Sequence, residues 1–275
     1  MTDPTLIFIV PYRNRAEQRI FFLNYMKYIL EDYEDSDYKI LFIEQNDDGL
    51  PFNRGAMKNI GLLVVKDLYP KSYKNKTLIF NDVDTCPHKK ALLEYKTISS
   101  KVKHFFGTRN ALGGIVSITA WDFERIGGFP NYWAWGYEDN VLQARVNHPA
   151  SKLKIDRSQF HSMNDQAILH LFDGEFRNLD MNTNVLEGNT EPTNTLRDII
   201  GLEYEMINHK SSSNLALAYT SVLVKKFDIK NHPPNKTSQK SVNLLKHGKV
   251  IGQHIQSYQD RKNRKIGMNF NLRRR

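Results

Sequence analysis

The sequence predicts an α/β protein whose central sheet is largely parallel, and the first fifty residues carry the prediction. Residues 5–10 form a continuous run of apolar and β-branched side chains, as expected of a buried strand. Residues 17–30 carry apolar side chains at close to helical spacing, and residues 38–43 form a second strand-like run. A strand, a helix and a second strand in this order are typical of a parallel sheet with crossover helices.

The same alternation continues along the chain. A helix is expected over residues 57–68, with Asn53 as its N-cap, and a third strand over residues 77–80. Residues 89–103 are interpreted as a helix that passes into a basic linker. The later expected elements are a strand at 115–118, a short helix at 121–126, a helix at 138–146, a long polar lid and acceptor loop at 164–213, and one or two strands within 214–227.

Length and composition set the outer limits. A chain of 275 residues that is 40% hydrophobic can bury a proper core, as one large domain with an appendage or as two small domains. Cys86 is the only cysteine, so an intramolecular disulfide is excluded; we expect a small buried hydrophobe, with a reactive thiol as the alternative. No stretch approaches the ~20 apolar residues of a membrane span, and residues 6–10 make a poor signal peptide. A soluble, cytoplasmic protein is therefore expected.

The net charge of +9 comes from the C-terminal end. Residues 231–275 hold eleven Lys and Arg and one acid, Asp260, which gives +10, whereas the first 230 residues sum to −1. We expect a solvated extension; the alternative is an electrostatic arm that contacts an anionic membrane, a polysaccharide or a nucleic acid. Because this segment shows no aromatic platform for single strands, no specific nucleic-acid partner is expected.

Basic residues follow the first strand and begin the second helix. Arg13 and Arg15 come directly after residues 5–10, at the carboxyl edge where open α/β sheets bind ligands, and their forked guanidinium groups suit a diphosphate. Arg54 follows Asn53 at a helix N-terminus, which also attracts anions. A solvated loop and a plain helix start are the alternatives.

Two acids follow the third strand. Along an extended backbone, residues two apart point the same way, so the carboxylates of Asp82 and Asp84 are expected to converge. Carboxylate oxygens at a strand end are suitable ligands for Mn²⁺, or for Mg²⁺, bridging a diphosphate. A bare Asp-x-Asp occurs often by chance, and its position after an apolar run is what favours a metal site.

Residues 131–140 combine aromatic rings with adjacent acids. Four aromatic residues in this stretch, two tyrosines and two tryptophans, precede Glu138 and Asp139, which lie in the first turn of the helix expected at 138–146. The helix dipole favours ionised carboxylates there. An ionised carboxylate beside tryptophan is a reasonable general base for a sugar hydroxyl. A tryptophan-rich turn that packs a core is the alternative.

Taken in order, five motifs resemble those of the β-1,4-galactosyltransferase family. They are Pro11-Tyr12-Arg13-Asn14-Arg15, Phe52-Asn53-Arg54-Gly55-Ala56, Asp82-Val83-Asp84, Gly113-Gly114, and Gly128-Phe129-Pro130-Asn131-Tyr132-Trp133-Ala134-Trp135-Gly136-Tyr137-Glu138-Asp139. The resemblance covers about residues 5–165. It implies a GT-A type fold, a Rossmann-like mixed α/β domain that binds a UDP-sugar with Mn²⁺ and transfers the sugar with inversion.

The resemblance also implies roles for individual residues. Asp139 would be the catalytic base and Glu138 a contact for substrate hydroxyls. Asp84 and His161 would bind the metal, and Met163 stands where the third ligand varies within the family. The donor would be bound by Pro11, Arg13, Arg15, Phe52, Arg54, Asp82, Val83, Ala111, Gly114 and Trp135, the last on a lid loop; Trp133, Tyr137 and Asn140 would line the acceptor site.

Four departures from the family pattern bear on specificity. Asn140 replaces an acid that contacts an acceptor N-acetylhexosamine, which leaves the acceptor open. Ala111 replaces a bulky tyrosine, so a 2-acetamido group on the donor sugar would fit. Ala134 and Tyr137 replace glycines, which would reshape the acceptor cleft. Animal members begin with a membrane anchor and stem; a chain lacking both fits a microbial or viral enzyme, or a trimmed chain.

The sequence thus predicts a GT-A catalytic domain at residues 1–230, with a nucleotide-binding part at about 1–112 and an acceptor part at about 113–230, followed by a basic extension at 231–275. The predicted function is that of an inverting glycosyltransferase, which moves Gal, GalNAc or GlcNAc from a UDP-sugar to a glycan hydroxyl. The alternative is a non-catalytic sugar or UDP-sugar binding protein derived from the same fold.

Overall fold

The N-terminal part of the chain forms the parallel centre of a sheet. The computed structural model describes residues 3–47, 49–171, 176–180, 194–210, 217–234 and 239–243. Strand β1 (Leu6–Tyr12) pairs in parallel with β2 (Tyr38–Gln45) on one side and β3 (Thr77–Asn81) on the other. Helices α1 (Ala16–Ile29) and α2 (Arg54–Leu68) make the two crossovers. The predicted strand–helix–strand opening is confirmed.

Further strands extend this centre on both sides. Next to β3 comes β6 (Ile115–Thr119), which is antiparallel to β3, and then β5 (Lys101–Gly107), which is antiparallel to β6. On its other side β5 pairs in parallel with β7 (Lys154–Asp156) and β8 (His161–Ser162). On the far side, β12 (Tyr219–Ile229) runs parallel to β2, and β11 (Ile199–His209) is antiparallel to β12. The resulting nine-stranded order is β11-β12-β2-β1-β3-β6-β5-β7, with β8 on β5. The mixed sheet confirms the predicted α/β class.

The remaining elements are short. Helix α3 (Ala120–Arg125) and helix α4 (Glu138–Asn147) lie between β6 and β7 in the chain. Two antiparallel ribbons pair β4 (Thr85–Pro87) with β9 (Ile168–His170), and β10 (Phe176–Asp180) with β13 (Gln239–Asn243). Single 3₁₀ turns occupy Tyr73–Asn75, Pro149–Ser151 and Leu196–Asp198.

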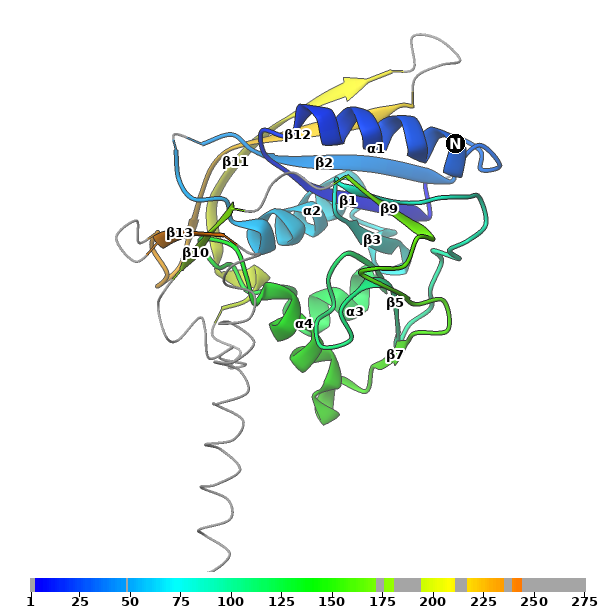
Figure 1. Ribbon diagram of the computed structural model, residues 1–275. Coiled ribbons are helices and arrows are strands. Elements are labelled where there is room, and N and C mark those ends of the chain that lie inside the picture. Colours follow the sequence, from blue (N-terminus) through cyan, green and yellow to red (C-terminus); the bar gives the residue numbers. More distant parts are fainter. Residues whose placement is uncertain are drawn as a thin grey trace, which may run out of the picture.

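The sheet separates two hydrophobic clusters, because side chains of a strand point alternately to its two faces. Ile7 and Ile9 of β1 belong to one cluster with Ile60 of α2, whereas Phe8 belongs to the other with Phe22 of α1. Figure 1 shows α1 and α2 on opposite sides of the central strands. The core therefore fixes α2, whose first turn contributes to the site, against β1.

Two predictions about secondary structure are wrong. Residues 89–100 form no helix; Leu93, Tyr95 and Thr97 are buried and alternate with exposed residues, so this stretch is extended and leads into β5. The helical interpretation overlooked a period of two. Residues 164–213 are not one long loop, because β9, β10 and β11 lie within them; residues 172–175, 181–193 and 211–213 lie outside the described part.

The basic extension is described only in part. Residues 231–234 and β13 are described, and β13 pairs with β10. Residues 235–238 and 244–275 lie outside the described residues, and the prediction of an electrostatic arm falls mainly on them.

Candidate functional site

Charged side chains gather at the carboxyl ends of β1, β2 and β3, where an open α/β sheet is expected to bind its ligand. After β1, Arg13 donates a 2.5 Å hydrogen bond from Nη1 to the Leu50 carbonyl and lies 3.7 Å from Asp47, which follows β2. Arg15 lies 3.2 Å from Asp84, beyond the end of β3. The structure therefore brings the predicted donor arginines and the predicted metal acid to one edge of the sheet.

Helix α2 begins at this edge and is held there by Asn53. The Asn53 side chain accepts a 2.9 Å hydrogen bond from the Ala56 amide, as predicted for an N-cap, and donates one of 3.0 Å to the carbonyl of Asn131. The cap therefore also ties α2 to the chain that leads into the aromatic stretch. The predicted donor residue Phe52 is half-buried directly before this cap.

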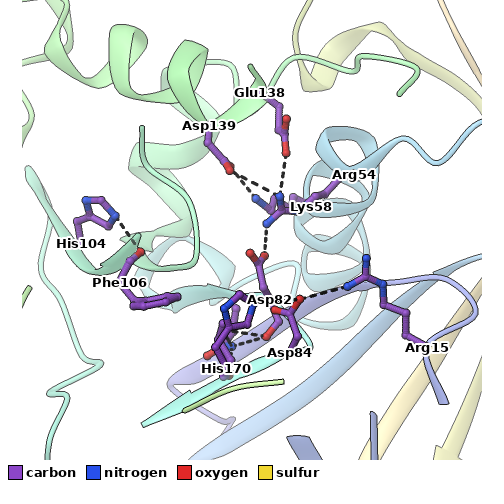
Figure 2. A network of polar contacts seen from close by, with 12 residues as sticks. Arg15, Arg54, Lys58, Asp82, Asp84, His104, Phe106, Glu138, Asp139 and His170 are labelled. Atoms are coloured by element: carbon purple, nitrogen blue, oxygen red, sulfur yellow. Dashed lines mark hydrogen bonds and ion pairs between the residues drawn. The ribbon is translucent and has the colours of Figure 1, made fainter. Parts of the chain in front are cut away.

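Arg54, the first residue of α2, is at the centre of the cluster. Its guanidinium group forms an ion pair with Asp82, lies 3.2 Å from Glu138, and lies 3.7 Å from Asp139 (Figure 2). Burial alone would lower the pKa of Arg54, but these three carboxylates raise it well above its ordinary value. Arg54 thus joins the carboxyl end of β3 to the start of α4.

The surroundings shift the pKa values of the two adjacent acids of α4 in opposite directions. Glu138 is buried, and burial together with the neighbouring charge of Asp139 raises its pKa. For Asp139, burial acts in the same upward direction, but Lys58 and Arg54 hold its pKa below the ordinary value. Opposed pKa shifts in neighbouring carboxyl groups are typical of a site where one group stays ionised as a base.

Backbone geometry before α4 is unusual. Tyr137, the N-cap of α4, has φ +66°, and Ala134 has φ +137°. These are the two positions where the sequence replaces family glycines, and both keep a backbone conformation that glycine adopts without strain. Strained residues of this kind concentrate at functional sites. Trp135, between them, is 38% exposed, which suits the lid role that its prediction assigns.

The double-tryptophan stretch divides into a packed half and an exposed half. Trp133 is 4% exposed, stacks on Phe227 with ring centroids 5.0 Å apart, and donates a 2.8 Å hydrogen bond to the carbonyl of His232. Trp133 therefore packs inside the protein in this structure, and its part in lining the acceptor site stays a prediction. For Trp133, the structure agrees with the alternative interpretation of residues 131–140, a tryptophan-rich turn that packs a core.

The glycine pair lies between β5 and the start of α4. A side chain at Gly113 would overlap the carboxyl group of Asp139, since an ideal Cβ would lie 2.8 Å from its Cγ. Gly114 has φ +71° and its carbonyl accepts a 3.1 Å hydrogen bond from the Asp82 amide. Ala111 and Asn140 lie nearby, because the Asn140 side chain donates a 3.0 Å hydrogen bond to the carbonyl of Asn110.

Asp82 and Asp84 do not project as alternate residues of a strand. Strand β3 ends at Asn81 and residues 82–84 turn, so the period-two argument for their convergence does not apply. Asp82 faces Arg54, whereas Asp84 faces Arg15 and His170 (Figure 2).

The imidazole that the structure places beside Asp84 is that of His170. Pairing of β4 with β9 sets Thr85 opposite His170, and His170 Nε2 lies 3.7 Å from the Asp84 carboxylate. Burial would raise the pKa of Asp84, but His170, Arg15 and Arg54 hold it below its ordinary value. No sequence pattern pointed to His170, because only strand pairing brings it to Asp84.

The two other predicted metal ligands are His161 and Met163. His161 Nδ1 is 2.8 Å from Asp165, and Met163 is 47% exposed. Within the described residues, no group of three or more His, Cys, Asp and Glu is arranged to hold a metal ion. The roles of His161 and Met163 stay predictions.

Lys58 is a second residue that the sequence reading missed. It is almost fully buried on α2, and its Nζ lies 2.8 Å from Oδ1 of Asp139. A signal was present: Lys58 follows Arg54 by four residues, which places both cations on one face of a helix.

Comparison with known proteins identifies the family of this chain. Residues 2–95 match the family model of the N-terminal region of glycosyl transferase group 7, and residues 94–170 match that of the N-terminal domain of galactosyltransferase. These consecutive matches cover more than half of the chain. The chain belongs to the β-1,4-galactosyltransferase family.

Relatives within this family match the same region. β-1,4-galactosyltransferase 4 of Homo sapiens is 32% identical over 160 residues, which are 54% of this chain and 44% of the relative. β-1,4-galactosyltransferase 1 of Mus musculus is 32% identical over 149 residues, which are 51% of this chain and 36% of the relative. The matched region spans less than half the length of these relatives.

Solved structures share the fold. The catalytic domain of Drosophila β-1,4-galactosyltransferase 7 in complex with xylobiose superposes with a TM-score of 0.63 at 21% identity, over 81% of this chain and 94% of that one. A mutant of the same enzyme, solved with manganese, UDP-Gal and xylobiose, gives the same TM-score at 20% identity and the same coverage. These members share the GT-A type architecture that the resemblance implied. Among the described helices of this chain, none is long and apolar enough to cross a membrane.

Proposed function

We propose that this galactosyltransferase-family chain is an inverting glycosyltransferase that moves a hexose or N-acetylhexosamine (Gal, GalNAc or GlcNAc) from a UDP-sugar to a glycan hydroxyl. The observation that carries the proposal is the ion-pair network around Arg54, which joins Asp82 beyond β3 to Glu138 and Asp139 on α4. Donor-side and acceptor-side groups thus share one charged cluster, as transfer between two bound substrates requires.

The residues of the chain support each part of the transfer. Arg13, Arg15 and Arg54 supply guanidinium groups that suit the diphosphate of the donor. The ionised Asp139 removes the proton of the acceptor hydroxyl as its oxygen attacks the anomeric carbon. The bond to the diphosphate oxygen breaks with its electrons going to UDP, the configuration inverts, and the proton ends on Asp139. Trp135 would close over the donor and exclude water.

A divalent cation is implied by the family, and the mutant Drosophila enzyme was solved with manganese. The side chains of this chain fit such an ion in part. The buried Asp84 carboxylate and the His170 imidazole lie 3.7 Å apart, and Arg15 lies 3.2 Å from the same carboxylate. Ions that bridge phosphates need only one or two protein carboxylates, with phosphate oxygens and water completing the shell. When bound, the ion would neutralise charge that develops on the departing diphosphate.

The test is release of UDP from a panel of UDP-sugars, with and without glycan acceptors, xylobiose among them. Replacement of Asp139 by Asn should lower kcat by about 10²–10⁴-fold, the contribution typical of a general base. Binding of a UDP-sugar without any release of UDP would instead identify a non-catalytic binding protein, and the proposal would be wrong.

The metal site calls for its own comparison, because prediction and structure name different histidines. If the ion binds where the structure places the imidazole, His170→Ala should raise the Mn²⁺ concentration needed for half-maximal activity, and His161→Ala should not. The reverse result would support the ligand that the resemblance implies. With either histidine as ligand, Asp84→Ala should abolish the Mn²⁺-dependent activity. Unchanged turnover in this variant would refute both assignments.

The identity of the donor sugar is proposed to depend on Ala111. A small side chain there leaves room for a 2-acetamido group, so Ala111→Tyr should lower kcat/KM for UDP-GalNAc and UDP-GlcNAc relative to UDP-Gal. An unchanged preference would remove this explanation of specificity.

A further inference from the structure

Lys58 is a buried cation that contacts Asp139 from the interior of the protein. Its side chain is 2% exposed, whereas that of Asp139 is 17% exposed. Its Nζ lies 2.8 Å from Oδ1 of Asp139 and 4.4 Å from the centroid of the Phe129 ring. Figure 2 shows Lys58 reaching from α2 toward Asp139 on α4. A substrate can therefore approach Asp139, but Lys58 lies behind it.

The two carboxylate oxygens of Asp139 have different surroundings. Oδ1 accepts the short hydrogen bond from Lys58. Oδ2 packs against Gly113 and lies 3.7 Å from Arg54 Nη1, which is too long for a hydrogen bond. Among the described residues, no donor lies within hydrogen-bond distance of Oδ2. One oxygen is thus held and the other is left to accept a proton.

We propose that Lys58 is the positioning residue of the base: it fixes Oδ1 of Asp139, keeps the carboxylate charged, and leaves Oδ2 to receive the proton of the acceptor hydroxyl. This inference rests on the proposed function and adds to it a residue that no family motif in the sequence contains. The proton moves from the acceptor oxygen to Oδ2, and Lys58 stays protonated throughout.

Among the described residues, Lys58 is the cation whose ion pair is made with Asp139 alone. Arg54 is shared among three carboxylates, and its guanidinium group is also proposed to bind the diphosphate of the donor. The other titratable neighbours do not replace it. Glu138 is an acid and brings no positive charge, and His104 of β5 stays neutral near pH 7, since burial and Arg157 lower its pKa to about 4.

The direction of the pH effect follows from these charges. Lys58 lowers the pKa of Asp139, which burial would otherwise raise, so its removal should raise the pKa. A nearby opposite charge typically shifts a carboxyl pKa by about one to three units. Because Asp139 acts as a base only when ionised, the acid limb of the kcat profile should move to higher pH by about that amount in Lys58→Met.

The experiment compares three variants with the parent chain. Lys58→Met removes the charge at similar volume, and Lys58→Arg keeps a cation. Lys76→Met is the matched control: Lys76 is also a buried lysine, bonded to the Pro4 carbonyl at 2.7 Å and packed on the Tyr69 ring, but it lies at the opposite end of β3. UDP release is measured from pH 3 to 9, so that the acid limb of the parent falls within the range, and folding is checked by circular dichroism at each pH.

We expect Lys58→Met to lose about tenfold in kcat for each pH unit below its shifted limb and to approach the parent at high pH. Lys58→Arg and Lys76→Met should keep the limb of the parent. An equal loss at every pH in Lys58→Met, with the limb unmoved, would show a merely structural role and overturn the inference.

A second measurement separates this inference from the proposed function. Carbon-13 NMR follows the Asp139 carboxyl directly, without substrate, with its signal assigned from Asp139→Asn. Its pKa should be higher in Lys58→Met than in the parent, and equal values would reject the role of Lys58 even if transfer is demonstrated. A parent chain that releases no UDP from any donor would reject the proposed function, while the titration still decides on Lys58.

Discussion

Gly113 offers a test of how closely the base must be placed. An ideal Cβ on Gly113 would lie 2.8 Å from the Cγ of Asp139 and closer still to Oδ2. Ordinary van der Waals contact begins at 3.4 Å, so Cγ must retreat by the difference, 0.6 Å, and Oδ2 by more. Gly113 lies outside the left-handed region, so alanine fits its backbone and the overlap with Asp139 is the main effect.

We therefore expect Gly113→Ala to displace the carboxylate by about 1 Å while the fold is retained. A displacement of this size typically costs on the order of 10²-fold in rate, or about 2.7 kcal/mol in the barrier. The assay is kcat for UDP release at saturating donor and acceptor, with the melting temperature measured on the same samples.

Gly201→Ala is the matched control for a methyl group that strains the backbone without touching the site. Gly201 has φ +59°, and its nearest neighbour would be 3.9 Å from the added Cβ. It should lower stability and leave kcat unchanged. If Gly113→Ala kept kcat within about threefold of the parent, the inference that Asp139 needs this exact packing would be refuted.

Two further predictions concern stability and reactivity. Arg145 of α4 is buried and donates hydrogen bonds to three backbone carbonyls, including that of Gly128 at 2.6 Å, so Arg145→Met should cost about 3 kcal/mol and lower the melting temperature by roughly 6–12 °C. The exposed Arg197→Met serves as its control, and equal melting temperatures for the two variants would contradict the role of the carbonyl contacts. Burial and the charge of Asp84 raise the pKa of the Cys86 thiol, so the native protein should resist Ellman's reagent and react only after unfolding. Rapid labelling of the native chain would show that Cys86 is accessible.

Local sequence patterns were sufficient where a single element determined the outcome. The apolar run before Pro11 predicted β1, and Asn53 predicted the cap of α2, because burial of a strand and capping of a helix depend on residues close in the chain. The order of motifs also identified the family, since each motif sits at the end of such an element. The prediction for residues 89–100 failed because the local pattern there was weak. Buried and exposed residues alternate over only a short stretch, so a helix was expected where the chain is extended.

Contacts between distant segments decided the rest of the site. The sequence by itself determined that Arg54, Asp84 and Asp139 would lie at ends of elements that face one edge of a sheet. Only the tertiary structure decided that His170 lies beside Asp84, because pairing of β4 with β9 joins residues 85 and 170. The same holds for Lys58, whose ammonium meets Asp139 through packing of α2 beside α4 across 81 residues of chain. A sequence shows which side chains carry charge, but long-range packing sets the distances between them, and electrostatic effects depend on those distances.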